Sequence, residues 1–364
     1  MKKISLILTV IFATAILFTS CKDKNEIKAD IIPSKFKVDI PSSISNATSK
    51  SDKDGVLDGN DIYGHLRTFI AVGEGSADIV QAIMGAIREY ELDQAMSFSY
   101  TSDEDGRTKN VVIIENSTFE GQTYEYKLTT TDQDGGKALQ IFWNNSPVKG
   151  VSILKPYNIN RSETDNWSGE NTMYRVDYSE ASTNYDAEMT VYISGLVLPG
   201  STTGEDRFAM ETLKMFAGKK GDIVDVYGNS NHPNAYFFNE TGEKGFNWAF
   251  AASGDDSSNI GVAEVGLPAS SLNTTSRTVL LENNSIHNIF NNELVALNYP
   301  QVDIDVYLAQ TQAPGYFSNS GFLNAGTSPG TSYDAIQSSM ENLTPYNPVS
   351  VSNLTISFKD DDAS

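Results

Sequence analysis

Apolar side chains recur at helical spacing near the start of the folded sequence. Within 61–73 they are Ile62, Leu66, Phe69 and Ile70, and within 76–90 they are Ile79, Val80, Ile83, Met84, Ile87 and Tyr90. Spacings of three and four residues predict two amphipathic helices. Asn60 or Asp61 can cap the first, Gly73 and Gly75 end it, and Ser76 can cap the second. The wide second stripe predicts packing against a sheet.

From residue 96 the apolar period changes from 3.6 to 2, which predicts strands. Two hairpins are indicated, 96–100 with 110–115 and 123–130 with 137–143, because Asp- and Gly-rich turns separate their strands. A further pair is predicted at 173–178 and 187–194. Later strands are expected at 223–227, 246–251, 261–265, 279–281, 302–308 and 351–358. Helices are expected at 205–217 and 333–342.

Strands that follow one another through hairpins favour an α+β fold. We predict a mostly antiparallel β sheet, curved or half-barrel-like, with the N-terminal helices packed on it. The apolar content of 39%, with 17 Tyr and 17 Phe, is sufficient for a large core. The folded region is expected at 61–358, as one domain or as two halves near 61–200 and 201–358, followed by an acidic tail at 359–364.

The first 20 residues have the three parts of an export signal. Lys2 and Lys3 precede an apolar run at 4–18, which is shorter than the ~20 residues of a membrane-spanning helix. Small residues, Thr19 and Ser20, then precede Cys21. This stretch resembles the lipobox of bacterial lipoproteins, although Phe18 replaces the usual aliphatic residue. The alternative is an ordinary secretory signal with an incidental cysteine.

The lipobox resemblance implies that 1–20 are cleaved and that Cys21 carries diacylglycerol and a fatty acyl chain such as palmitate. Several acyl chains, at about 0.8 kcal/mol per buried CH₂, would anchor the chain firmly to a membrane. Cys21 is the only cysteine in the sequence. Its use for lipid leaves no disulfide and no thiolate metal ligand.

A charged segment, Lys22-Asp23-Lys24-Asn25-Glu26, follows the cysteine. It resembles the charged tetrad of surface-exposed lipoproteins of the Bacteroidetes type, which implies an outer-membrane location facing the cell exterior. A plain hydrophilic spacer is the alternative. Residues 21–60 contain Pro33, Pro41 and a polar stretch at 42–53, so we expect a flexible lipid-anchored tether.

Negative charge excludes two classes of partner. Removal of the signal segment, which carries two lysines and no acidic residue, changes the formal net charge from −21 to −23. Nucleic acid and anionic lipid head groups are repelled by such a surface.

Candidate metal chemistry is confined to one segment. Asp52, Asp54, Asp58 and Asp61 surround Gly55 at spacings that partly match an EF-hand calcium loop. Lys50 occupies the first ligand position, so an Asp- and Gly-rich turn that ends in a helix cap is the alternative. No other cofactor is indicated. The three histidines, His65, His232 and His287, lack metal-ligand spacing.

Two residues are candidate ligand contacts. Trp167 lies in a polar, loop-like segment, where an exposed ring would indicate binding and a ring folded inward would anchor the loop. His232 lies in a polar, turn-like segment and could line a site or be solvated. We recognise no catalytic motif in its expected structural context in the sequence, so we expect a protein without enzymatic activity.

Three functions remain open, and each predicts a different structure. The leading hypothesis is a surface lipoprotein that acts as a binding module or an accessory subunit of an outer-membrane protein assembly, and it predicts a solid core. A carrier of an apolar ligand such as lipid predicts an enclosed apolar cavity in a half-barrel. A surface polysaccharide hydrolase predicts two carboxylates roughly 5–10 Å apart in a cleft with aromatic rings.

Overall fold

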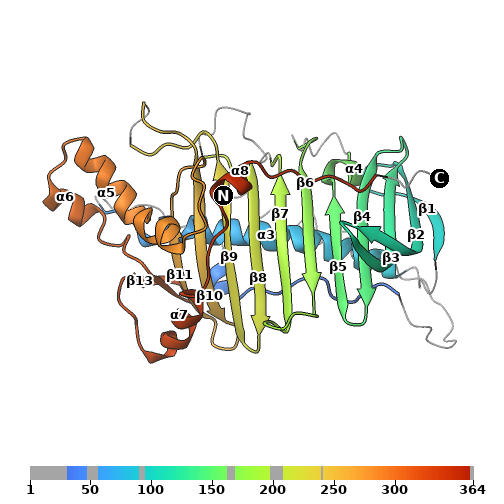
Figure 1. Cartoon of the computed structure of the whole chain (residues 1–364), viewed down its shortest axis with the longest axis horizontal. Coiled ribbons are helices and arrows are strands. Elements are labelled where there is room, and N and C mark those ends of the chain that lie inside the picture. The colour runs from blue at the N-terminus through green and yellow to red at the C-terminus, as the bar shows by residue number, and fades with distance from the viewer. Residues whose placement is uncertain are drawn as a thin grey trace.

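A computed structural model describes residues 31–46, 56–89, 95–161, 169–196, 208–238 and 241–360. These residues form an α+β fold built on an open, antiparallel sheet of 13 strands (Figure 1). Each strand pairs with the strands before and after it in the chain, so the sheet order is the sequence order. The predicted fold class is confirmed.

The strands are β1 (Met96–Thr101), β2 (Thr108–Phe119), β3 (Gln122–Asp132), β4 (Lys137–Asn145), β5 (Val148–Leu154), β6 (Met173–Ser179), β7 (Ala187–Ser194), β8 (Thr212–Lys220), β9 (Ile223–His232), β10 (Phe246–Asp255), β11 (Ile260–Gly266), β12 (Gly315–Ser318) and β13 (Gly321–Ala325). The helices are α2 (Ser42–Ser45), α3 (Gly59–Arg88), α4 (Pro156–Ile159), η2 (Thr278–Asn283), α5 (Ile286–Ala296), α6 (Gln301–Tyr307), η3 (Thr331–Tyr333), α7 (Asp334–Met340) and α8 (Pro348–Ser352).

Helix α3 crosses one face of the sheet, which we call the helix face (Figure 1). The Asp58 side chain caps it by accepting a hydrogen bond from Asn60 N at 2.8 Å. The buried side of α3 packs on the alternate, inward-facing residues of the central strands and forms the main core with them. Helix α3 is long and apolar enough to span a membrane. Buried core helices can have the same length and composition, so this is weak evidence for a membrane span.

The two N-terminal helices predicted from the sequence are one continuous helix. Gly73 lies inside this helix and does not end it. A Cβ at this position would lie 2.5 Å from Met215 Cε and 3.4 Å from Leu213 Cδ2. The glycine instead permits close approach of helix and sheet. Ser76 donates to the Val72 carbonyl at 2.9 Å and lies within the helix.

Residues 31–46, which we expected to belong to the tether, are part of the core. Phe36, Val38 and Ile44 are almost fully buried, and the Phe36 ring lies 5.2 Å from the Tyr178 ring. The Trp143 indole donates a hydrogen bond to the Ile31 carbonyl at 2.7 Å. The polar residues between these apolar positions concealed the pattern of an extended segment with one buried side.

The later part of the chain required four corrections to the predicted elements. The helix expected at 205–217 is contradicted by β8, in which Leu213, Met215 and Ala217 alternate inward. The strand expected at 279–281 is the π-helix η2, and the strand expected at 302–308 is α6. The strand expected at 351–358 is the end of α8 followed by an extended segment without strand pairing.

Several strands and helices were missed by the pattern. Among them are β5, β12, β13, α2, α4 and α5. Their apolar residues are too few, or too interrupted by Gly and Asn, to show a period.

The face opposite α3 is covered at both ends of the sheet. At one end η2, η3 and α7 pack on β9–β12 around Ala251, Val262 and Tyr316. At the other end Ile356 and Phe358 of the C-terminal segment pack against a cluster that includes Phe142 and Ile153. The middle strands of this face keep partly exposed side chains.

Candidate functional site

The middle of the face opposite α3 carries polar and aromatic side chains in rows. One row across neighbouring strands is Lys149, Ser179 and Glu188. The next rows are Val151, Asp177, Thr190, Phe216 and Tyr227, and then Ile153, Arg175, Tyr192, Lys214 and Asn229. Because adjacent strands lie about 4.8 Å apart, residues in one row are direct neighbours. We call the part of these rows on β6–β9 the open floor: Arg175, Asp177, Glu188, Thr190, Tyr192, Lys214, Phe216 and Tyr227.

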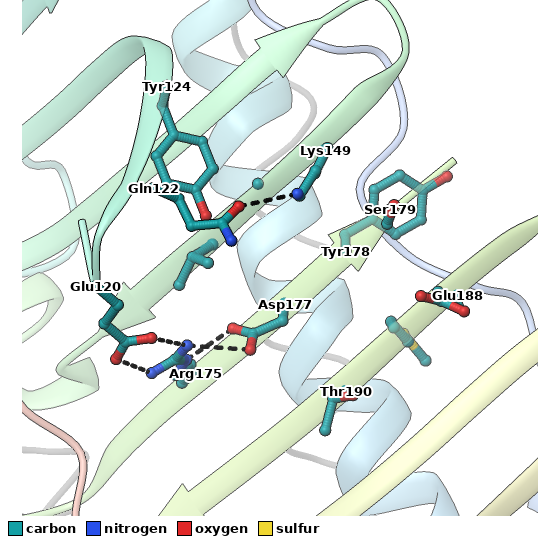
Figure 2. A pocket seen from close by; sticks show the side chains of 13 residues that line it. Glu120, Gln122, Tyr124, Lys149, Arg175, Asp177, Tyr178, Ser179, Glu188 and Thr190 are labelled. Carbon is teal, nitrogen blue, oxygen red and sulfur yellow. Dashed lines mark hydrogen bonds and ion pairs between the residues drawn. The ribbon is translucent and has the colours of Figure 1, made fainter. Parts of the chain in front are cut away.

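A pocket of about 290 Å³ lies between the open floor and the end of the β2–β3 hairpin (Figure 2). Its polar lining residues are Glu120, Gln122, Lys149, Arg175, Asp177, Ser179, Glu188 and Thr190. This volume is close to the lower end of the range for small-molecule sites.

The pairing of β2 with β3 is interrupted at Asn116. This residue has a φ of 55° and no partner in the register, which is the same on both sides of it. Beyond Asn116, the Phe119 ring stacks on the Phe142 ring of β4 with centroids 4.7 Å apart. The turn residue Glu120 therefore lies near β6, which is distant in the order of the sheet.

Arg175 joins the hairpin to the open floor, as Figure 2 shows. Its Nη1 and Nη2 donate to the two Glu120 carboxylate oxygens at 2.6 and 2.8 Å. Its Nε and Nη2 donate to Asp177 at 2.7 and 3.1 Å. Lys149 Nζ donates to Gln122 Oε1 at 3.0 Å and forms a second link to the hairpin.

The two carboxylates on Arg175 have opposite pKa shifts. Hydrogen bonding to the Arg175 guanidinium lowers the pKa of Glu120. Burial raises the pKa of Asp177, and hydrogen bonding to Arg175 offsets that effect only in part. The site therefore contains one carboxyl that ionises readily and one that ionises less readily.

Tyr192 lies between two cations on the open floor. Arg175 Cζ is 5.3 Å and Lys214 Nζ is 5.1 Å from the centre of its ring. Lys214 also lies over the Tyr346 ring at 4.0 Å. Burial lowers the pKa of Lys214 and raises the pKa of Tyr192. Cationic and aromatic groups therefore alternate in the order Arg175, Tyr192, Lys214 and Tyr346, with a cation–π contact between each neighbouring pair.

Polar groups remain for a ligand at the other side of the pocket. Among the described residues, the half-buried Glu188 carboxylate has no hydrogen-bond or ion-pair partner. Lys149 uses one N–H for Gln122 and retains two further donors. Ser179 lies between these two residues in their row, and Thr190 adds a second hydroxyl group in the next row. The pocket therefore presents both donors and acceptors.

The sequence-predicted site residues lie elsewhere. His232 belongs to β9 and is buried beside α3, with its ring 5.0 Å from Phe69. Its Nε2 lies 2.8 Å from Ser230 Oγ and its Nδ1 lies 2.9 Å from the Phe208 carbonyl oxygen. His232 is therefore neither in a turn nor on the open floor. Trp167 and the lipidation residue Cys21 lie outside the described residues.

The predicted calcium loop is only partly described. Asp58 caps α3 and Asp61 lies in its first turn, whereas Asp52 and Asp54 fall outside the described residues. Within the described ranges, no group of three or more His, Cys, Asp or Glu side chains is arranged to hold a metal ion.

The open floor was not predicted, although the sequence contains a signal for it. In 173–179 the residues Arg175 and Asp177 alternate with buried Tyr174, Val176 and Tyr178. Alternation of this kind shows which residues share a face of the sheet. It does not show that the hairpin 117–123 lies over that face, where Phe119 stacks on Phe142 and Glu120 pairs with Arg175.

A second cavity, of about 510 Å³, lies beside η2 and the start of α5. The ion pair of Glu264 with Arg277 forms one wall, and Glu282, His287 and Glu341 also line it. Burial raises the pKa of Glu264, with Arg277 opposing it. Like the first pocket, this cavity has a polar lining.

Comparisons with known proteins give no relative for this chain. No family model matches it, and neither a curated protein nor a solved structure is detectably similar to it.

Proposed function

We propose that this chain is an outer-membrane, surface-exposed lipoprotein that acts as a binding module or an accessory subunit of an outer-membrane protein assembly. Lipid on Cys21 would hold it to the membrane, and the open floor with its pocket would bind the ligand or partner. No nucleic acid partner is expected for a chain with a net charge of −21.

One observation carries this proposal. The helix face of the sheet is closed by α3 and by residues 31–46, whereas the opposite face leaves Arg175, Tyr192 and Lys214 partly exposed between two covered ends. Arginine and tyrosine are the residues most often found where binding energy is concentrated. Their cation–π contacts and ion pairs hold the side chains in place before a ligand arrives.

Core packing favours a binding module over a carrier of apolar ligands. Tyr63, Leu66 and Ile70 of α3 are at most 1% exposed and contribute to one continuous core with the sheet. A carrier would need an apolar space between helix and sheet, and both cavities described above are lined by charged side chains.

A surface polysaccharide hydrolase is a second candidate, favoured by the carboxylates on Arg175. Both accept hydrogen bonds from Nη2, at 2.8 and 3.1 Å, so their nearest oxygens lie within about 6 Å of each other, a spacing compatible with glycosidase pairs. Asp177, with its raised pKa, would be the general acid, and Glu120 would be the ionised carboxylate.

Purification with bound partners tests the leading proposal. The full-length, tagged protein is isolated from gently solubilised membranes and compared with Cys21→Ala, which would remain unanchored. Stoichiometric recovery of an outer-membrane protein, lost when Tyr192→Ala and Lys214→Ala are combined, is the expected result. Recovery of the protein alone, or of a partner indifferent to these changes, would contradict a binding role for the open floor.

Activity on polysaccharides tests the second candidate. Release of reducing ends from a panel of soluble polysaccharides is measured for the unaltered protein, Asp177→Asn and Glu120→Gln. A hydrolase should lose activity by at least about 100-fold in each variant. If the unaltered protein releases no reducing ends from any member of the panel, the hydrolase is rejected and the binding module is unaffected.

A further inference from the structure

Helices α5 and α6 form a hairpin that projects beyond the end of the sheet (Figure 1). Its inner side is well packed. Ile286, Phe290 and Leu294 of α5 are buried, and the Phe290 ring lies 4.8 Å from Phe237 and 5.0 Å from Phe238. Gln301 Nε2 donates to Asn291 Oδ1 at 2.8 Å and links the two helices. The hairpin is thus a fixed element of the fold.

The outer side of this hairpin is apolar and exposed. Every residue from 295 to 303 is exposed. Five large apolar side chains, between 42% and 67% exposed, lie on the hairpin: Val295, Leu297, Tyr299, Val302 and Val306. We call these five residues the hairpin tip. Exposed apolar residues are common one at a time, but a group on a single rigid element indicates an interaction surface.

Helix α6 has two apolar sides. Ile304 and the following Leu308 are buried against the body of the protein. Val302 and Val306, four residues apart, form a second stripe that faces solvent. An amphipathic helix needs only one apolar side to pack on its own domain. The second stripe therefore has no role within the described fold.

Charge around the hairpin tip has a single sign. Asp303 and Asp305 are exposed beside Val302 and Val306. From residue 278 to residue 358 the sequence has six acidic residues and neither Lys nor Arg. An apolar centre with an acidic rim is complementary to apolar side chains flanked by Lys or Arg.

We propose that the hairpin tip is the docking surface for a partner protein that presents apolar side chains flanked by Lys or Arg. This inference rests on the proposed role as an accessory subunit and assigns a second contact with the assembly to the hairpin tip, in addition to the contact at the open floor. A second copy of the chain would bring two acidic rims together. A bilayer would have to bury Asp303 and Asp305 next to the inserted valines, and transfer of charged carboxylates into hydrocarbon is unfavourable.

Photo-crosslinking in native membranes tests this inference. A photoreactive phenylalanine analogue replaces Tyr299 in the full-length lipoprotein, and the same analogue at Lys220, an exposed residue at the end of β8, serves as the control. The expected result is one protein adduct from position 299 and none from position 220. Mass spectrometry of the adduct should place the link within a few residues of Lys or Arg in the partner.

Two variants keep the test specific. Val302→Asp adds a charge at the centre of the hairpin tip and should reduce the adduct at least about tenfold. Asp303→Lys combined with Asp305→Lys retains the apolar residues and reverses the rim, and it should also reduce the adduct. Both substitutions are at exposed positions, so the fold should be retained, as circular dichroism would check.

Several outcomes would overturn the inference. An adduct with lipid, an adduct with a second copy of this chain, or a protein adduct unchanged by both variants would each do so. The proposed function is tested separately by co-purification. If Val302→Asp still recovers its outer-membrane partner while Tyr192→Ala with Lys214→Ala does not, the binding module stands and the hairpin tip is not its docking surface.

Discussion

Arg175 connects parts of the chain that are far apart in the sheet order. Its guanidinium holds Glu120 of the hairpin turn and Asp177 of its own strand while lying 5.5 Å from the Phe119 ring. Asp177 is the more buried of the two acids, with 30% of its side chain exposed against 56% for Glu120. Removal of Arg175 would leave a partly buried carboxylate without its charge partner.

We therefore predict unequal effects at the two ends of this network. Arg175→Ala should lower the free energy of unfolding by about 2 kcal/mol, because Asp177 loses its partner. Glu120→Gln, at an exposed position, should lower it by less than about 1 kcal/mol. Urea unfolding of both variants measures the difference, and equal effects would show that Arg175 acts mainly through Glu120.

A second charged cluster, distant from the pocket, joins the β1–β2 turn to the β3–β4 turn. Lys109 is 1% exposed, and its ammonium group donates to Asp105, Asp132 and the Asn158 carbonyl at 2.9 to 3.0 Å. Arg107 Nε also donates to Asp132. Burial opposes ionisation of Asp132, but hydrogen bonds from Arg107 and Lys109 outweigh it and lower the pKa of this carboxyl to about 2.

This cluster predicts a loss of stability in acid. Since the pKa of Asp132 is lower in the folded state than in the unfolded state, its ionised form stabilises the fold above about pH 4. That contribution, on the order of 2 kcal/mol, disappears as the pH falls from about 4 to about 2. Asp132→Asn should accordingly be less stable than the unaltered protein at pH 7, and the gap should narrow below pH 4.

Denaturant unfolding across this pH range makes the measurement. The matched control is Asp103→Asn, an exposed residue near the neighbouring turn, which should leave both the stability and its pH dependence unchanged. A gap between Asp132→Asn and the unaltered protein that stays constant from pH 7 to pH 2 would contradict the cause assigned to the pKa shift.

At the scale of elements, α3 shows how tertiary packing decides what a glycine does. Gly73 lies against Met215, whereas a Cβ on Gly75 would meet no atom within 4 Å. Both glycines are unfavourable in an isolated helix because of their backbone entropy. Only Gly73 has a compensating role, which is the close packing of α3 on β8.

Alanine substitution at these two positions should have opposite effects. Gly75→Ala should raise the free energy of unfolding by about 0.5–1 kcal/mol, since it removes backbone entropy without a clash. Gly73→Ala should lower it by about 1–3 kcal/mol, because the new methyl group overpacks against Met215. Thermal or urea unfolding distinguishes them, and stabilisation by both variants would show that the helix can move away from the sheet.

The sequence predicted those elements whose pattern is local, and it missed those that depend on contacts between distant residues. Alternation within 173–178 and 187–194 identified β6 and β7, because local period alone specifies a strand with one buried face. In 205–217 a chance helical spacing of Ala209, Leu213 and Phe216 concealed β8, whose pairing with β7 and β9 involves residues that are distant in sequence. The pocket depends on such long-range contacts, including the pairing of Glu120 with Arg175, so its residues could not be grouped in advance.

At the scale of the whole molecule, the N-terminal segment determines which face of the sheet is available. Residues 31–46 and α3 together close the helix face, and Phe36 fits there because Gly150 has no side chain: a Cβ on Gly150 would lie 3.0 Å from Phe36 Cζ. The open floor on the other face is covered only in part, by Glu120 of the hairpin over Arg175 and by Tyr346 over Lys214 and Tyr227. A lipoprotein held by Cys21 would thus have one face closed by α3 and residues 31–46, and an opposite face open to a binding partner.

The packing of this segment is itself testable. Phe36→Ala should lower the free energy of unfolding by about 3–5 kcal/mol through the cavity it leaves. Lys35→Ala, at a neighbouring exposed residue, should change it by less than about 0.5 kcal/mol. If both substitutions change the free energy of urea unfolding by similarly small amounts, residues 31–46 belong to the flexible tether that the sequence predicted.

We propose that the face opposite α3 is the binding face of a membrane-tethered module. The test is hydroxyl-radical footprinting of the full-length protein in native membranes, compared with purified Cys21→Ala. We predict that oxidation of Tyr192, Tyr227 and Tyr346 falls severalfold in membranes, while oxidation of Met96, which is exposed on the edge strand β1, stays constant. Unchanged oxidation of the three tyrosines, or protection confined to the solvent side of α3, would contradict this account.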